Sequence, residues 1–354
     1  LGGALDMRGN FRLRKFLAGG SSLTEAHFAD GGALEEVDYP ATTSYVELKN
    51  LDNLTNEKCN TEACAPNVMS YFVSGCDNLQ PVKKLIDIMD AQVGQTPHAL
   101  RYVRCVGFNE TFTDGRAFDK LSQLVDGTYQ GIDAEGQYGN DPYPVLDGTI
   151  NLTTGAYRDT YDALMTHYPK LKLNIAKWWI RFEDPEVKRI CIENWDKDGD
   201  GELSMEEAAA VSSIGTMFSY NNNITNLNDF QYFHNVRNLN NAFAYCTGLV
   251  DVRFWEGVEE LGDNCIGYCP SVRIVDFPST IKHLGQQFLR YPMNKNKGVV
   301  ICRAKTPPGI HSYSTRINAL TLYVPDDSLE LYRADNNMTI FISTNIRPLS
   351  EYQG

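Results

Sequence analysis

Long apolar runs and basic residues are scarce in this sequence. No window of about 18 apolar residues exists, so we expect no membrane-spanning helix. The first residues, LGGALDMRGNFRLRKF, lack the apolar core of a signal peptide, so we expect no export signal or lipid anchor within this chain. Lys and Arg number 32 against 45 Asp and Glu, which sets the formal net charge at −13. Such a surface repels nucleic acid and anionic membranes, so neither is an expected partner.

Recognisable catalytic motifs are absent as well. The six histidines are scattered, with no H-E-x-x-H pair and no Cys or His cluster at zinc-binding spacing. The sequence has no phosphate-binding glycine loop and no G-x-S-x-G nucleophile turn. We therefore expect a protein that is not an enzyme.

A repeat of 23 residues dominates the last third of the chain. Its six positions, read in two consecutive units, are Leu249, Val252, Phe254, Val258, Leu261 and Gly262, then Val272, Val275, Phe277, Ile281, Leu284 and Gly285. A related unit begins 22 residues earlier, at Leu227. Apolar and polar residues alternate around Val252, which predicts a short strand with one buried face. Units this short must stack to bury their apolar faces, so the pattern predicts a solenoid with parallel strands.

The nine cysteines are spread from Cys59 to Cys302, and their number is odd. We expect most of them to be buried thiols, not disulfides. The spacing of Cys265 and Cys269 is also compatible with a metal or redox site. However, Cys246 and Cys269 share one repeat position, which favours a ladder of buried thiols.

The first half has a different pattern. Residues 23–28 and 34–39 share a short apolar motif at an interval of 11 residues, which suggests abbreviated solenoid turns. Helix and strand signals then alternate. We expect helices at 81–89, 115–124 and 157–167 and strands at 147–152 and 171–175, with a parallel pair from the strand–helix–strand order. This part either continues the solenoid or forms a separate α/β insert. The expected parts are 1–80, 81–182, a helix–loop–helix element at 183–215, and repeats with a C-terminal cap at 216–354.

One acidic segment, DKDGDGELSMEE at 196–207, has the spacing of an EF-hand calcium loop. Calcium prefers six to eight oxygen ligands, and alternating acidic residues supply them as the backbone curls around Gly201. The expected metal ligands are Asp196, Asp198, Asp200, the carbonyl of Glu202, Ser204 through a water molecule, and Glu207. Regulatory EF-hands usually occur in pairs, and this sequence has one such loop. We therefore expect Ca²⁺ to be a structural clamp.

A ligand-binding surface is predicted from the strand alternation. Gln231, Arg253 and Asp276 share the outward position of three consecutive units, and Trp255 follows close by. We expect these four side chains to line up on one exposed sheet face.

The repeats at residues 224–354 resemble the BspA-type leucine-rich-repeat proteins, a family of bacterial surface and secreted proteins. The resemblance rests on C-x-x-L-x-x-V-x-F at 246–254, on its counterpart at 269–277, and on I-x-x-L-G-x-x-F at 281–288. The ending LYVP at 322–325 with RPL at 347–349 is similar to the terminal cap of such proteins. Trp255 stands where the family often has proline, and Cys265 replaces an expected phenylalanine.

This resemblance implies an α/β leucine-rich-repeat solenoid. It also implies a secreted or cell-surface protein that recognises a host or neighbouring-cell protein or glycan. We expect a monomer. The alternative is an accessory subunit or enzyme of carbohydrate or peptide processing, with its site in the N-terminal half. A deep pocket with converging carboxylates at residues 60–180 would favour that alternative, whereas an open sheet face would favour the scaffold.

Overall fold

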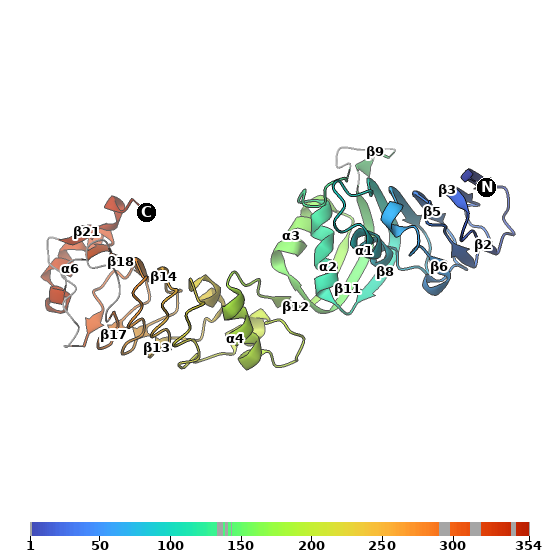
Figure 1. Ribbon diagram of the computed structural model, residues 1–354. Coiled ribbons are helices and arrows are strands. Elements are labelled where there is room, and N and C mark those ends of the chain that lie inside the picture. Colours follow the sequence, from blue (N-terminus) through green and yellow to red (C-terminus); the bar gives the residue numbers. More distant parts are fainter. Residues whose placement is uncertain are drawn as a thin grey trace. The chain divides into compact units, whose positions relative to one another are not determined.

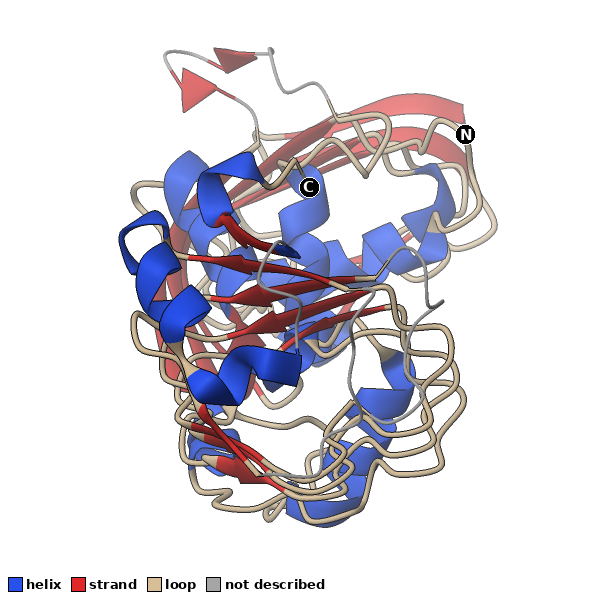
Figure 2. Cartoon of the chain, turned by 90° about the vertical axis from the view of Figure 1, so that its left-hand side faces the viewer, coloured by secondary structure: helices blue, strands red, loops and turns tan. Residues whose placement is uncertain are grey.

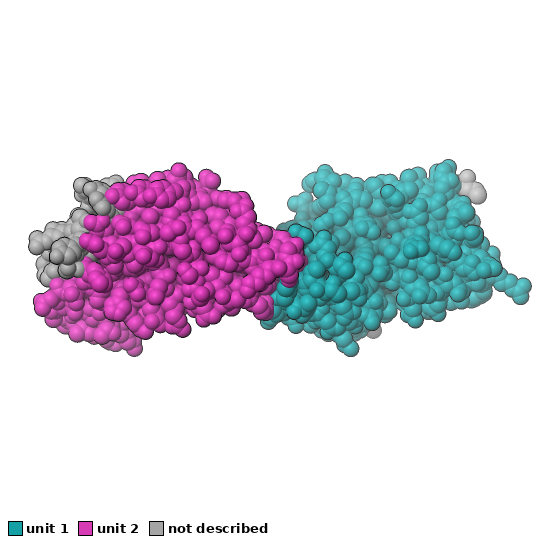
Figure 3. All heavy atoms as spheres, turned by 90° about the horizontal axis from the view of Figure 1, so that it is seen from below, with its two compact units in different colours: residues 1–178 teal, residues 179–354 magenta. Residues whose placement is uncertain are grey.

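The computed structural model describes residues 2–132, 137–138, 141–142, 144–289, 298–311, 320–340 and 345–353. The chain divides into two compact units, Leu1–Trp178 and Trp179–Gly354 (Figure 3). Each unit has its own cluster of buried apolar side chains. In the part of the chain that the structure describes, no helix is both long and apolar enough to cross a bilayer.

The first unit is built on a seven-stranded sheet in which the registered strand pairs are parallel (Figure 1). In spatial order its strands are β1 (Gly2–Met7), β3 (Ser22–Phe28), β5 (Tyr45–Lys49), β7 (Ser70–Ser74), β8 (Tyr102–Phe112), β11 (Val145–Tyr157) and β12 (Lys172–Trp179). A smaller parallel sheet contains β2 (Lys15–Leu17), β4 (Glu36–Asp38) and β6 (Cys59–Asn60). The chain thus alternates between the two sheets through its first turns, which explains the short apolar repeat.

Three helices cover the buried face of the large sheet: α1 (Pro81–Ala91), α2 (Gly115–Asp119) and α3 (Arg158–His167). The expected helix at 115–124 is α2 followed by the 3-10 helix η3 (Lys120–Leu124). The remaining short elements are η1 (Asn56–Lys58), η2 (Ala65–Asn67) and the antiparallel pair β9 (Gln137–Tyr138) and β10 (Asp141–Pro142). Strands β7, β8, β11 and β12 extend the sheet that the first 60 residues begin. Residues 81–178 therefore contribute to the same sheet as the first 60 residues.

The second unit begins with α4 (Pro185–Trp195), α5 (Met205–Ala209) and η4 (Asn228–Tyr232). Two parallel sheets follow (Figure 2). One contains β14 (Asp251–Arg253), β16 (Ile274–Phe277), β18 (Val299–Cys302), β20 (Thr321–Val324) and β21 (Ile346–Pro348). The other contains β13 (Asn238–Leu239), β15 (Glu260–Leu261), β17 (His283–Leu284) and β19 (Gly309–Ile310). The C-terminal segment adds η5 (Asp326–Ser328), α6 (Leu329–Ala334), η6 (Asn336–Ile340) and η8 (Leu349–Glu351).

The predicted strand register is confirmed in the repeats. Val252 pairs with Val275 and Leu261 with Leu284, which is the 23-residue offset of the sequence. The unit that begins at Leu227 is different, because residues 228–232 form η4 where the pattern predicted a strand. Its apolar skeleton is nevertheless buried, and Phe230 is 0% exposed. The buried Asp229 carboxylate in η4 accepts the backbone N–H groups of residues 183 and 184 (2.8 and 2.9 Å).

All nine cysteines are free and buried, as the sequence predicted. Two equivalent thiols form the expected ladder: Cys246 Sγ donates to the Phe218 carbonyl (3.0 Å) and Cys269 Sγ to the Phe243 carbonyl (3.2 Å). Burial raises the pKa of Cys246 to about 11 and that of Cys269 to about 12. A metal or redox function needs an accessible thiolate, which this environment disfavours.

Candidate functional site

The acidic loop lies between two helices whose ends are set by local hydrogen bonds. Helix α4 ends at Trp195, and Ser204 caps α5 in a capping box in which Ser204 and Glu207 exchange hydrogen bonds. Gly199 and Gly201 turn the chain with φ of +72° and +80°, a conformation that favours glycine. Leu203 is fully buried, and its carbonyl accepts the Ile180 N–H (2.8 Å). These contacts attach the loop to the hydrophobic core of the second unit, which contains both Leu203 and Ile180.

Three carboxylates converge in this loop. Asp196, Asp198 and Glu207 each offer an oxygen, and these oxygens lie within 4.8 Å of one another. Asp196 accepts the N–H groups of both loop glycines (2.7 and 2.9 Å), and Glu207 Oε1 accepts the Lys197 N–H (2.8 Å). Negative charges this close repel one another, and a set of oxygen donors suits a hard cation such as Ca²⁺.

The side chains of the other three predicted ligands make hydrogen bonds or an ion pair. Asp200 accepts the indole N–H of Trp179 (3.0 Å) and the Glu202 N–H (2.8 Å). The Glu202 side chain is buried in an ion pair with Lys188 (2.7 Å), so only its carbonyl is left for a metal, as the loop position requires. The Ser204 hydroxyl donates to Glu207 Oε2 (2.8 Å).

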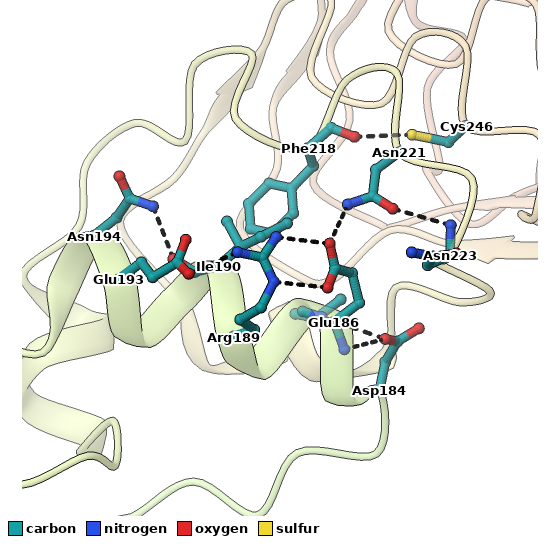
Figure 4. A network of polar contacts seen from close by, with 11 residues as sticks. Asp184, Glu186, Arg189, Ile190, Glu193, Asn194, Phe218, Asn221, Asn223 and Cys246 are labelled. Atoms are coloured by element: carbon teal, nitrogen blue, oxygen red, sulfur yellow. Dashed lines mark hydrogen bonds and ion pairs between the residues drawn. The ribbon is translucent and has the colours of Figure 1, made fainter.

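Helix α4 directly precedes this loop, and its first residues contact the segment where the repeats start (Figure 4). The Asp184 carboxylate caps the helix by accepting the Glu186 N–H (2.9 Å), and it also accepts the Thr225 N–H (3.1 Å). Glu186 accepts from Arg189 (2.8 Å) and from the Asn221 side-chain amide (2.7 Å). These contacts lower the pKa of Glu186 to about 2. Helix α4, which precedes the loop, thus fixes the turn at residue 221 through the Glu186–Asn221 hydrogen bond.

The prediction that four side chains line up on one exposed sheet face is wrong in part. Arg253 lies exposed on β14 and pairs in register with Asp276 on β16. Asp276 is only 5% exposed, because Arg303 binds its carboxylate through two hydrogen bonds (2.7 and 2.9 Å). Gln231 is exposed but belongs to η4, outside the sheet.

Trp255 needs the same correction. Its side chain is 6% exposed and lies in the core of the second unit. The indole N–H donates to the Phe233 carbonyl (3.2 Å), and the ring stacks on Phe230 with centroids 5.4 Å apart. An aromatic residue with these contacts supports packing and is not available to a ligand. Of the predicted row, only Gln231 and Arg253 are exposed.

A different set of aromatic residues is exposed on the repeats. Tyr220, Tyr245 and Tyr268 form a stack, here called the tyrosine ladder, with ring centroids 4.5 and 4.4 Å apart and planes within 7° and 4°. All three have positive φ (+59°, +61° and +62°), which is rare for a bulky side chain. Tyr220 is 72% exposed and Tyr245 36%, whereas Tyr268 is half-buried.

The turn backbone holds the tyrosine ladder in register. The Tyr220 N–H donates to the Ala244 carbonyl and the Tyr245 N–H to the Gly267 carbonyl, each at 2.8 Å. Our sequence reasoning missed these residues. The available signal was the tyrosine that directly precedes each of the two repeated cysteines, Cys246 and Cys269.

On the large sheet of the first unit, half-buried His27 lies between Glu25 (3.1 Å) and Glu47 (3.8 Å). Half-buried Tyr45 packs edge-on against buried Phe72 with centroids 5.6 Å apart.

An open groove of about 620 Å³ also runs beside α1, and Glu57, Glu62, Asp87 and Asp90 contribute to its lining. Buried Lys84 donates to the Cys59 carbonyl there (2.7 Å). Within the described residues, three potential metal-ligating groups converge only in the acidic loop, so the carboxylates of this groove do not form such a cluster.

Comparison with known proteins agrees with the repeat geometry. No protein of curated function matches the chain. Residues 204–295 match the model of the BspA type leucine rich repeat region in six copies. The matched segment contains the whole tyrosine ladder and the last residues of the acidic loop. This part of the chain is therefore similar to the leucine-rich repeats of BspA-type proteins.

Proposed function

We propose that this chain is a non-catalytic binding scaffold, secreted or at a bacterial cell surface, that recognises a host or neighbouring-cell protein or glycan. The observation that supports this most is the tyrosine ladder. Left-handed backbone costs a non-glycine residue about 1–3 kcal/mol, and such strain is found mainly at functional sites. Aromatic rings exposed next to one another also favour a binding surface.

The repeat architecture supports the same proposal. From β13 onward, strands from successive repeats add to two parallel sheets, so equivalent side chains recur at regular intervals. We propose that these units form a solenoid, a form that offers an extended surface for large ligands. Leucine-rich repeats in general suggest interaction with proteins, which is compatible with this function.

Calcium is part of the proposal as a structural ion. Asp196, Asp198 and Glu207 would hold it, and its charge would offset the repulsion among their carboxylates. The loop joins α4 to α5, and Glu186 on α4 binds Asn221 at the beginning of the tyrosine ladder. Bound calcium would therefore stabilise the segment from which the repeats start.

The alternative of an enzyme in the first half has less support. The groove beside α1 is open, and Asp90 is paired with Lys120 on its rim. Its acidic residues do not converge in the way a metal-dependent or multi-carboxylate site requires.

A binding array tests the proposed function. The intact chain is applied to host matrix proteins and glycans, once with millimolar calcium and once with chelator, and bound ligands are recovered for mass spectrometry. We expect specific binding that weakens on chelation, and ligands recovered without cleavage. Cleaved ligands would favour the enzyme, and a chain that binds nothing in either condition would contradict the scaffold.

A further inference from the structure

We infer that the tyrosine ladder binds an uncharged glycan, with one sugar ring stacked on the open face of Tyr220. This inference rests on the proposed scaffold function and specifies its ligand class and contact residue. It is carried by three observations: the lack of charged residues in the segments that carry the ladder, the geometry of the rings, and the polar groups beside them.

The segments that carry the tyrosine ladder contain no charged residue. Residues 212–228, 238–250 and 264–272 lack Asp, Glu, Lys and Arg, although charged residues are 22% of the chain. Helix α4 brings one ion pair against these segments, because the Glu186 carboxylate that binds Arg189 also accepts the Asn221 side-chain amide. A polyanion or a basic peptide would find no complementary charge in these segments, so the ladder suits a neutral ligand.

Ring geometry distinguishes among neutral ligands. Successive rings lie 4.4 to 4.5 Å apart and nearly parallel, so each inner face is covered by its neighbour. A proline-rich peptide places its proline rings in grooves between aromatic side chains. The stacked rings of the tyrosine ladder leave no groove of this kind between them. Tyr220 ends the described stack and is 72% exposed, which leaves its outer face open. A flat aromatic face of this kind fits the C–H face of a pyranose ring.

Polar groups next to the rings complete the match. The Thr247 hydroxyl donates to the Asn222 side-chain oxygen (2.7 Å), and both residues are exposed. Their remaining donors and acceptors can hydrogen-bond to sugar hydroxyls. Asn221, which is held from α4 by Glu186, directly follows Tyr220 and keeps this turn in place. A sugar stacked on Tyr220 would thus have the Asn222 amide two residues away in the same turn, with the Thr247 hydroxyl bonded to it from the turn of the neighbouring repeat.

The test compares substitutions that keep the backbone favourable. Tyr220→Asn removes the ring but suits positive φ, because asparagine tolerates this conformation better than other non-glycine residues. Tyr220→Phe keeps the ring. Phe11→Asn is the matched control, since Phe11 is 60% exposed and belongs to the first unit. The intact chain and each variant are titrated with neutral glucan, galactan and mannan oligosaccharides, sulfated oligosaccharides and a proline-rich peptide. Far-UV circular dichroism and thermal melting confirm that each variant is folded.

We expect binding of at least one neutral oligosaccharide, weakened at least about tenfold by Tyr220→Asn. Tyr220→Phe and Phe11→Asn should change the affinity less than about threefold. Unchanged glycan affinity in folded Tyr220→Asn would overturn the inference, as would binding only to sulfated glycans or to the peptide. If neutral glycans fail but proteins on the array bind, the inference is wrong and the scaffold stands. If nothing binds, both are wrong.

Discussion

Tyr220, Tyr245 and Tyr268 take a backbone conformation that a β-carbon disfavours, and they do so at equivalent turns. Ring stacking offsets part of this cost, since an aromatic pair is worth about 0.5–1.5 kcal/mol beyond its buried area. The strain and the stacking belong together, because the left-handed turn is what brings each ring over the next. A single residue type at a single turn position thus produces a continuous aromatic stack, which is most exposed at Tyr220.

Glu110, unlike the exposed Tyr220, is a charged-type residue in a buried environment. Its side chain is 1% exposed, and its carboxylate accepts the N–H groups of residues 82 and 83 (2.6 and 3.0 Å) at the start of α1. Burial raises its pKa from 4.5 to about 7, although these hydrogen bonds lower it. Between these two values the folded state binds more protons than the unfolded state. Stability should therefore fall as the pH rises from 4.5 to 7.

We predict that Glu110→Gln removes this pH dependence. The free energy of unfolding of the unmodified protein should fall by about 3 kcal/mol more than that of the variant between pH 4.5 and 7. Urea titration at several pH values measures this difference. The exposed Glu62 provides the control, because Glu62→Gln should keep the pH dependence of the unmodified protein. Parallel pH curves for the protein and Glu110→Gln would show that the carboxyl group titrates normally.

At the scale of elements, the acidic loop and the first repeat are one connected structure. Asp184 and Glu186, at the start of α4, bind Thr225 and Asn221 in the turn that precedes η4. The buried Asp229 carboxylate in η4 accepts N–H groups from residues 183 and 184 in return. These reciprocal bonds hold residues 221–229 to the start of α4, and Asn226 reaches the next strand only through an isolated bridge to Asp251.

Calcium binding should therefore stabilise the second unit. We predict that millimolar Ca²⁺ raises its melting temperature and that chelator reverses the change, because the ion binds only the folded loop. Glu207→Gln removes one charge from the three converging carboxylates and should abolish most of the shift. Its control is Glu206→Gln on the adjacent, exposed residue of the same helix. Equal calcium shifts in both variants would contradict a site at Glu207, and no shift in the unmodified protein would contradict calcium binding.

At the scale of the whole molecule, the two units contain separate apolar clusters. Buried residues between Phe16 and Leu171 supply one cluster, and residues from Ile180 onward supply the other. Each is large enough for a cooperative core, so each unit should unfold in its own transition.

We predict two calorimetric transitions, of which Gly285→Ala lowers only one. A β-carbon at Gly285 would lie 2.5 Å from the backbone carbon of Gly262, so the two repeats could not approach so closely. Overpacking of this kind costs about 1–3 kcal/mol, and each kcal/mol lowers the transition by about 2–4 °C. Gly9→Ala is the control, because a β-carbon at Gly9 meets nothing within 4 Å. A single transition, or a shift of both by Gly285→Ala, would show that the units unfold together.

Local pattern was sufficient for much of this protein. The apolar spacing around Val252 and Val275 predicted their strand register, because a buried face forces the same alternation on each unit. The burial of Cys246 and Cys269 followed from their shared repeat position. The acidic spacing from Asp196 to Glu207 likewise predicted the turn and the converging carboxylates, since ligand geometry in such a loop depends on neighbours in sequence.

Tertiary structure decided which side chains are accessible. The alternation of polar and apolar residues predicted that Trp255 and Asp276 are exposed. In the structure Trp255 instead binds the Phe233 carbonyl, and Asp276 binds Arg303 from another segment. The tyrosine ladder depends on positive φ and on turns of separate repeats lying 4.4 to 4.5 Å apart, and neither property can be read from hydrophobic periodicity. Local sequence therefore determined which elements form, whereas exposure depended on contacts between residues more than 20 positions apart.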